Sequence, residues 1–388
     1  MPARILVVDD EPDLEQLILQ KFRKQIRDGI FAFQFAGNGV QALERLAEDD
    51  AIDLVLTDIN MPEMDGLTLL NRIKEQDNPL LRSVIVSAYG DIENIRTAMN
   101  RGAFDFIIKP IDLNDLEITI NKSLHDLRVL KEAIQSRDQL MFIKHELGIA
   151  TEIQTSILPK VFPPFPDRKE FDIYAKMIPA REVGGDLYDF FQIDKARVGV
   201  IIGDVSGKGI PAAMFMAVSK TLLKATALKG IPPDSCLESV NTILVDESLP
   251  SMFVTVFYGI FDTRNGSFEY CSGGHNPPYI IGKDGQVRLL DNCGGLFLGS
   301  LKNLEYESSV VMLQPGETLF LVTDGITEAM NTGDDMFGEE RTEAALQTHA
   351  GKPLNELVDH VIEEVQAFAG AQEQSDDMTC LALRYFGR

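Results

Sequence analysis

Short apolar runs alternate with amphipathic segments over the first 110 residues, and this alternation limits the fold more than any other feature. The runs lie at residues 5–8, 31–35, 54–57, 84–87 and 104–108. Between them, apolar residues recur at helical spacing, for example at Leu67, Leu70 and Ile73. Five such strand–helix units predict an α/β fold, with a parallel sheet between layers of helices. In sheets of this kind, ligands bind beyond the carboxyl ends of the strands, where the strand order reverses.

Polar residues stand at the predicted strand ends. Asp9 and Asp10 follow the first strand, Asp58 the third, Ser87 ends the fourth and Lys109 the fifth. In the flavodoxin-like order 2-1-3-4-5, the first and third strands are neighbours, so three carboxylates converge. They repel one another unless a divalent cation lies among them, and a few hard oxygen ligands suit Mg²⁺. A lysine and a hydroxyl opposite them suit a phosphoryl group.

This segment resembles the receiver domain of two-component response regulators. The resemblance is carried by ILVVDDE, LTDINMPEMDG, VSAYG and FIIKP, in that order, and covers residues 1–122. It implies that a histidine kinase supplies a phosphoryl group to Asp58. The other implied site residues are the Mg²⁺ ligands Asp9, Asp10, Asp58 and the backbone carbonyl of Asn60, and the switch residues Ser87, Phe106 and Lys109.

A stretch without proline follows, from residue 113 to residue 157, and it contains one glycine, Gly148. Apolar residues recur there at spacings of three and four, which predicts one long helix, with residues 123–158 as a connector. A strict seven-residue step, as in a coiled coil, joins Ile120, Leu127, Ile134 and Met141. Ser123 and Arg137 interrupt the partner positions of this seam. Two interpretations are open: a helix that pairs with its twin in a parallel homodimer, and a helix packed on its own domains.

Strand-like segments dominate residues 159–388. They lie at 171–178, 187–193, 198–202, 253–261, 268–271, 287–290, 308–313, 318–322 and 381–385. Helical patterns occur near residues 211–227, 235–247 and 354–369. Many antiparallel strands with helices grouped apart predict a layered α+β sandwich.

Aspartates carry the chemistry of this second part. They are Asp186 in VGGDLYD, Asp204 in IIGDVSGKG, Asp324 in LVTDGITE, and Asp376 and Asp377 in QSDDMTC. The five histidines of the chain do not pair with His or Cys at zinc-ligand spacing. Carboxylates without imidazole or thiolate favour Mg²⁺ or Mn²⁺. Two such ions can activate a water and hold phosphoryl oxygens, and no serine or cysteine nucleophile motif competes with that water.

The second part resembles the PPM-type, metal-dependent serine/threonine protein phosphatases, in the bacterial branch that regulates sporulation and general stress sigma factors. The matching strings are EIQTSILP, VGGDLYDF, GDVSGKGIPAAMFM, SGGHNPP, LVTDGITEA and SDDMT. The resemblance implies a phosphorylated anti-sigma-factor antagonist with a STAS-type fold as the substrate. It implies two Mn²⁺ or Mg²⁺ ions at Asp186, Asp204, the Val205 carbonyl, Asp324, Asp376 and Asp377, the last of which stands where other branches carry Asn.

Some motifs of this part have plainer readings. His275 in SGGHNPP is expected to be a turn residue packed by its neighbours. The glycines of GDVSGKG lack the Walker spacing and are expected to let the backbone approach the metals. The basic phosphate-binding residue of the eukaryotic branch has no clear counterpart here.

Charge and composition exclude several function classes. The chain has 60 acidic and 36 basic residues, a net charge of −24, which argues against nonspecific binding of nucleic acid. A DNA-binding output would need a basic helix-turn-helix, and residues 123–388 contain no basic stripe. No run of about 18 apolar residues indicates a membrane span. The four cysteines are widely spaced and form no CxxC pair, which favours a reducing compartment, the cytoplasm.

These observations predict a response regulator whose output is a metal-dependent protein phosphatase controlled by Asp58. The alternative is a pseudo-phosphatase adaptor that binds a partner without catalysis. It would be expected to lack metal ligands, whereas all four aspartates, Asp186, Asp204, Asp324 and Asp376, are present.

Overall fold

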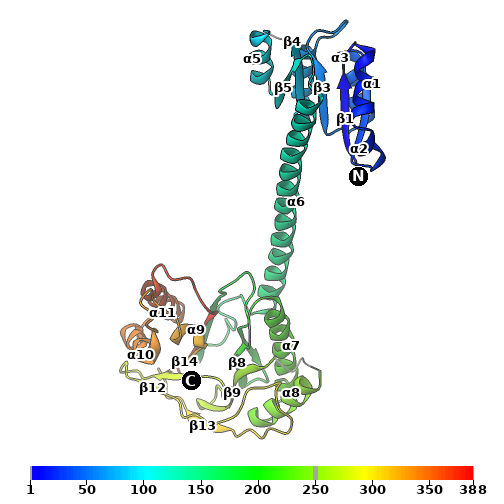
Figure 1. Ribbon diagram of the computed structural model, residues 1–388. Coiled ribbons are helices and arrows are strands. Elements are labelled where there is room, and N and C mark those ends of the chain that lie inside the picture. The colour runs from blue at the N-terminus through cyan, green and yellow to red at the C-terminus, as the bar shows by residue number, and fades with distance from the viewer. Residues whose placement is uncertain (1, 89, 248–251, 388) are drawn as a thin grey trace. The chain divides into compact units, whose positions relative to one another are not determined.

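The computed structural model describes residues 2–88, 90–247 and 252–387 (Figure 1). The chain divides into two compact units, Met1–Ile143 and Lys144–Arg388, which are described separately below. In the described part of the chain, no helix combines the length and the apolar character that crossing a bilayer requires.

Unit 1 contains one five-stranded parallel sheet in the order β2-β1-β3-β4-β5. The predicted flavodoxin-like order is therefore confirmed. The elements are β1 (Ala3–Val8), α1 (Pro12–Lys21), α2 (Arg23–Arg27), β2 (Phe31–Ala36), α3 (Gly39–Glu48), β3 (Leu54–Asp58), α4 (Gly66–Glu75), β4 (Arg82–Ala88), α5 (Ile92–Asn100) and β5 (Asp105–Lys109).

The central strands β1, β3 and β4 of unit 1 are buried on both faces. Alternate residues of β1 point to opposite faces, so Ile5 and Leu6 belong to different cores. Ile5 packs in a cluster with Phe22, whereas Leu6 packs in a cluster with Leu69 of α4. Helices on both faces hold the sheet, and the carboxyl ends of β1 and β3 meet at one edge.

The long helix α6 (Leu113–Ile157) has the predicted extent. Its early residues Ile120 and Leu127 are buried within unit 1. They therefore cannot form the dimer seam in which the seven-residue step placed them. Further along α6, Leu140 and Phe142 are 61% and 64% exposed. If α6 pairs with the same helix of a second chain, it does so through this later part of the helix.

Unit 2 contains two five-stranded antiparallel sheets, ordered β13-β10-β9-β8-β7 and β12-β11-β14-β15-β6. The strands are β6 (Phe171–Ile178), β7 (Leu187–Gln192), β8 (Arg197–Val205), β9 (Val254–Asp262), β10 (Ser267–Gly273), β11 (Tyr279–Ile281), β12 (Val287–Leu289), β13 (Ser309–Met312), β14 (Thr318–Val322) and β15 (Met378–Tyr385). The helices are α7 (Ile210–Ala227), α8 (Pro233–Glu247), α9 (Asp324–Thr327), α10 (Gly338–His349) and α11 (Leu354–Ala369).

Four layers follow from the alternation of buried side chains along the strands. Val200 of β8 packs with Leu321 of β14 in the core between the sheets. Ile201, the next residue, packs in the core that includes α7 and α8, and Phe320 packs in the core that includes α10 and α11. Figure 1 shows these two pairs of helices on opposite sides of the strands. The predicted layered α+β sandwich is confirmed.

Three elements of unit 2 were not predicted: β11, α9 and α10. The strand β11 has three residues and α9 has four, both too short for a periodic signal. The sequence of α10, GEERTEAALQTH, is polar over most of its length, so its helical periodicity is weak.

Candidate functional site

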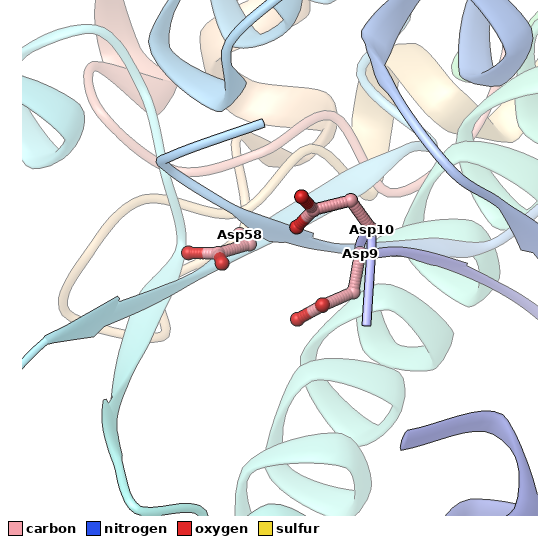
Figure 2. A group of neighbouring side chains, drawn as sticks. All are labelled: Asp9, Asp10 and Asp58. Atoms are coloured by element: carbon pink, nitrogen blue, oxygen red, sulfur yellow. The ribbon is translucent and has the colours of Figure 1, made fainter. Parts of the chain in front are cut away.

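The receiver carboxylates come together at the edge formed by β1 and β3. Oxygen atoms of Asp9, Asp10 and Asp58 all lie within 4.8 Å of one another (Figure 2). Asp58 is buried, whereas Asp10 is exposed. Among the described residues, this trio is the one group of acidic, histidine or cysteine side chains this close together. Its all-oxygen donor set fits the Mg²⁺ that the sequence implies.

Lys109 from the end of β5 neutralises part of this acidic charge. Its Nζ lies 2.7 Å from Asp58 Oδ2 and 3.1 Å from Asp9 Oδ2. A third carboxylate, Glu11, lies 3.1 Å away. Although burial opposes the charged form of Lys109, hydrogen bonds to these carboxylates raise its pKa well above the usual value. Burial also raises the pKa of Asp9.

The remaining receiver residues surround Asp58. The buried Ser87 Oγ has no hydrogen-bond partner among the described residues, so its hydroxyl is free for a further oxygen. The backbone N–H of Asn60 lies 3.4 Å from Asp58 Oδ1, and the Asn60 side chain is exposed. Phe106 is 37% exposed. A Cβ at Gly66 would collide with the Asp58 carbonyl oxygen, which explains the glycine of MPEMDG.

In unit 2, three of the predicted carboxylates gather where the two sheets meet. Asp186 lies just before β7, Asp204 lies in β8, and Asp324 starts α9 after β14. The Asp204 carboxylate is close enough to Asp186 for its charge to act on it. From the other sheet, the hydroxyls of Thr323 and Thr379 donate to Asp186 Oδ2 at 2.7 and 2.5 Å. These two threonines were not predicted, because they lie 137 and 193 residues from Asp186 in sequence.

Burial and, after it, mutual repulsion determine the protonation of this cluster. Burial, and then the neighbouring carboxylates, raise the pKa of Asp186 well above its usual range and that of Asp204 to about 7. The same causes raise the pKa of Asp324, whose buried Oδ1 has no hydrogen donor among the described residues. A divalent cation would relieve the repulsion between these carboxylates and would give the unpaired buried oxygen a partner.

Asp377 has a different set of contacts. Its carboxylate accepts hydrogen bonds from three backbone N–H groups, those of Ala180 at 2.8 Å, Gly185 at 2.5 Å and Asp186 at 3.3 Å. A Cβ at Gly184 would collide with this same carboxylate. Both oxygens thus anchor the segment that carries Asp186, and the glycines of VGGD allow the approach.

Lys208 is a cation of the cluster whose role the sequence analysis missed. Its Nζ lies 2.9 Å from Asp376 Oδ2 and donates to the Ser375 carbonyl. Its charge also acts to lower the pKa of Asp324, which burial and the neighbouring carboxylates raise. The available signal was a single lysine between the glycines of GDVSGKG in a strongly acidic chain.

The last turns of α6 contact the segment before Asp186. The buried Gln154 side chain donates from Nε2 to the Gly184 carbonyl at 2.5 Å and accepts from the Gly184 N–H at 3.0 Å. Thr151 Oγ1 donates to the Glu182 carbonyl at 2.6 Å. The string EIQTSILP pointed to this helix end without revealing its contacts.

His275 is buried, as a turn residue packed by its neighbours would be. Its Nδ1 lies 3.1 Å from Thr255 Oγ1, and its Nε2 lies 3.1 Å from the Val322 carbonyl. Burial lowers its pKa to about 4, so the ring is neutral near pH 7. It lies between β9 and β14, the strands beside Asp204 and Asp324.

Comparison with known proteins identifies a domain family in each unit. Residues 5–121 match the family model of the response regulator receiver domain, and residues 194–386 match that of stage II sporulation protein E (SpoIIE). The phosphoserine phosphatase RsbU of Bacillus subtilis is 30% identical over 243 residues, which are 62% of this chain and 70% of RsbU. The chain belongs to the SpoIIE phosphatase family. It is a receiver domain fused to a SpoIIE-type phosphatase domain.

Two further similar proteins match over different shares of their own length. Protein IcfG of Synechocystis is 29% identical over 265 residues, which are 61% of this chain but 41% of IcfG. The SiaA-PP2C domain of Pseudomonas aeruginosa has a TM-score of 0.56 at 22% identity, over 64% of this chain and 98% of that domain. The SiaA comparison shows that unit 2 has the PP2C fold.

Proposed function

We propose that this SpoIIE-type domain hydrolyses phosphoserine or phosphothreonine on a protein, and that phosphorylation of Asp58 controls the reaction. One observation carries the proposal: mutually repelling carboxylates, those of the buried Asp186 and the half-buried Asp204 and Asp324, lie where the two sheets meet. The 30% identity with a phosphoserine phosphatase, RsbU, supports the same chemistry. The proposed parts are the receiver at residues 1–122, the connector at 123–158 and the phosphatase at 159–388.

Two Mn²⁺ or Mg²⁺ ions would be held by Asp186, Asp204, Asp324 and Asp376, with help from the Val205 carbonyl. When bound, such ions supply a nucleophilic water at neutral pH and offset the negative charge of a phosphoester. The hydroxyls of Thr323 and Thr379 hold Asp186 in place. Asp377 serves as a backbone anchor in this scheme, because its oxygens already accept three N–H groups.

Lys208 is the proposed contact for the substrate phosphoryl group. It is partly exposed and lies against Asp376, at the acidic cluster. In a chain of net charge −24, an ammonium group at this place favours the approach of a phosphorylated partner.

In the receiver, Mg²⁺ would be held by Asp9, Asp10, Asp58 and the Asn60 carbonyl, and a histidine kinase would be the phosphodonor. Lys109 already contacts Asp58 and Asp9. Lys109 and the unpartnered hydroxyl of Ser87 would bind the new phosphoryl oxygens. Phe106 would change its side-chain position when Asp58 is phosphorylated.

The connector helix α6 is the proposed link between receiver and phosphatase, since its end binds Gly184 through Gln154. The exposed apolar residues from Leu140 to Ile153 are the proposed surface of a homodimer. The proposed substrate is a phosphorylated, STAS-type anti-sigma-factor antagonist, and the proposed location is the cytoplasm, where its free cysteines stay reduced.

The decisive experiment measures phosphate release from a phosphoserine protein by the purified chain, with Mn²⁺, with Mg²⁺ and with excess EDTA. We expect Asp324→Asn to lose turnover by about 100-fold or more, because the change removes a ligand charge without changing size. Asp284→Asn, at a turn outside the cluster, is the control and keeps wild-type turnover.

Full turnover in EDTA, or in Asp324→Asn, would contradict metal-dependent hydrolysis. Tight binding of the phosphoprotein by the wild-type chain without any release of phosphate would favour the adaptor.

A further inference from the structure

A small pocket of unit 2 opens beside the acidic cluster. It lies between the residues that follow α9, the end of α11 and the segment that leads to Asp376. Its volume of about 290 Å³ is at the lower end of the range that binds small molecules, about 300–1,000 Å³, so it suits a single side chain. The apolar side chains that line it are Ala329, Met330, Val365, Ala369 and Met378.

Contacts within unit 2 hold the wall of this pocket in place. Helix α11 ends at Ala369, and Gly370 turns the chain with a φ of 61°. Further along, Gln374 Nε2 donates to the Ile178 carbonyl of β6 at 2.9 Å and to the Asp376 carbonyl at 2.7 Å. The wall is thus tied to a helix at one end and to a strand at the other. A pocket that is already formed binds its ligand without the cost of ordering a loop.

The pocket shares a wall with the proposed phosphoryl contact. Ser375 and Asp376 line the pocket, and both contact Lys208, whose Nζ donates to the Ser375 carbonyl and lies 2.9 Å from Asp376 Oδ2. Gly325, which also lines the pocket, directly follows Asp324 of the cluster. A phosphoserine held at Lys208 therefore brings its neighbours in the substrate chain to the opening of the pocket.

We propose that this pocket is a specificity subsite, which binds an apolar side chain next to the phosphoserine of the protein substrate. This inference rests on the proposed phosphatase function. The apolar lining favours leucine or methionine, because binding there removes their surface from water. Glu373 and Asp376, which also line the pocket, disfavour an acidic side chain at the same place. Ala369 and Met330 determine the size of the side chain that fits.

The test uses phosphoserine peptides in which leucine occupies, in turn, each of the two positions on either side of the phosphoserine. The remaining residues are kept constant, with alanine at the other tested positions. For the full chain with Mn²⁺, we expect one position at which leucine lowers KM by roughly tenfold relative to alanine, and at which aspartate raises it. Equal KM values for leucine, alanine and aspartate at every tested position would overturn the proposal.

Two variants change the size of the pocket in opposite directions. Ala369→Leu fills it and should remove the preference for leucine, whereas Met330→Ala enlarges it and should shift the preference toward phenylalanine. Hydrolysis of p-nitrophenyl phosphate, which has no flanking residue, should stay at the wild-type level in both variants and so shows that they fold. Ala367→Leu, at an exposed position of α11 outside the pocket lining, is the matched control. An unchanged preference for leucine in both pocket variants would place the specificity elsewhere.

The same experiment separates the subsite from the proposed function. If the wild-type chain hydrolyses neither p-nitrophenyl phosphate nor any peptide, the proposed function is contradicted. Fluorescence anisotropy of labelled peptides then decides the subsite by binding alone. Tighter binding of the leucine peptide than of the alanine peptide, lost in Ala369→Leu, would support the subsite, and equal binding of the two peptides would overturn it.

Discussion

Asp186 and Asp377 were both predicted as metal ligands, yet their carboxylates have different partners. Asp186 feels the charge of the Asp204 carboxylate and accepts from two threonine hydroxyls. Asp377 accepts from three backbone N–H groups. A carboxylate surrounded by its own kind needs a cation, whereas one surrounded by N–H donors is already satisfied. Roles within the acidic cluster therefore follow from the donors around each oxygen.

At the same scale, Lys208→Met tests the proposed phosphoryl contact. Methionine keeps the length of the side chain and removes its charge. A hydrogen bond to a charged group is worth about 1.5–3 kcal/mol, so we expect KM for the phosphoprotein to rise by roughly tenfold or more. Inhibition by inorganic phosphate should weaken as well. Lys208→Arg, which keeps the charge, is the control, and an unchanged KM in Lys208→Met would contradict the assignment.

His275→Gln tests the buried imidazole. The folded-state pKa of about 4 lies below the ordinary value of 6.5. The unfolded chain therefore binds this proton more readily, and stability that is present above pH 6.5 is lost as the pH falls toward 4. The loss is on the order of 3 kcal/mol across that window.

The neutral glutamine should remove this part of the pH dependence. Urea unfolding of both proteins from about pH 7 down to about pH 4 measures it. Wild type should lose more stability than His275→Gln over that range. Parallel curves for the two proteins would show that His275 does not titrate differently on folding.

At the scale of elements, α6 has a different role along its length. Ile120 and Leu127 complete the core of unit 1. Gln154 and Thr151, near the other end, bind the backbone of residues 182–184. A helix transmits displacement along its axis because its backbone hydrogen bonds hold it rigid. The residues at its end are therefore the place to interrupt coupling without disturbing the receiver.

We expect Gln154→Ala to interrupt the coupling between α6 and the phosphatase without disturbing the receiver. The variant leaves the buried N–H and carbonyl of Gly184 without their partners, which costs about 1–3 kcal/mol each in local stability. Because Asp186 follows two residues later, we expect weaker Mn²⁺ binding, measured by calorimetry, and lower turnover. Gln139→Ala, on an exposed part of α6, is the matched control. Equal Mn²⁺ affinity in Gln154→Ala and wild type would contradict the proposed role.

For the whole molecule, the question is whether the state of Asp58 changes the phosphatase. A ligand shifts an equilibrium only by its difference in affinity between two states, and couplings are typically about 1–3 kcal/mol. Beryllofluoride mimics an acyl phosphate, and we expect it to bind at Asp58 with different affinities in the two states of the receiver. The proposed homodimer would make the response depend on both chains.

We expect beryllofluoride with Mg²⁺ to change phosphate release by the full chain, and Asp58→Asn to abolish the change. Light scattering on the same samples measures the molar mass. Asp50→Asn, at an exposed position before β3, is the control for altered charge in the receiver. A response that persists in Asp58→Asn would place the control elsewhere, and a monomeric mass in both states would contradict the homodimer.

The sequence by itself determined most elements and the kind of chemistry. The period of apolar residues is a local property, and it predicted the five receiver strands and the extent of α6, whereas their order came from the flavodoxin-like arrangement expected of such units. Carboxylates at strand ends likewise predicted the Asp9, Asp10 and Asp58 cluster, because parallel strands that are neighbours end at one edge.

Only the tertiary structure decided which side chains meet across the chain. Contacts between Gln154 and Gly184, and between Lys208 and Asp376, join residues that are distant in sequence. It also decided that Ile120 and Leu127 pack in the receiver core. A seven-residue step of apolar residues does not show which part of the protein covers those residues. The physical reason is that periodicity reports the face a residue occupies, whereas its partner depends on how distant segments pack.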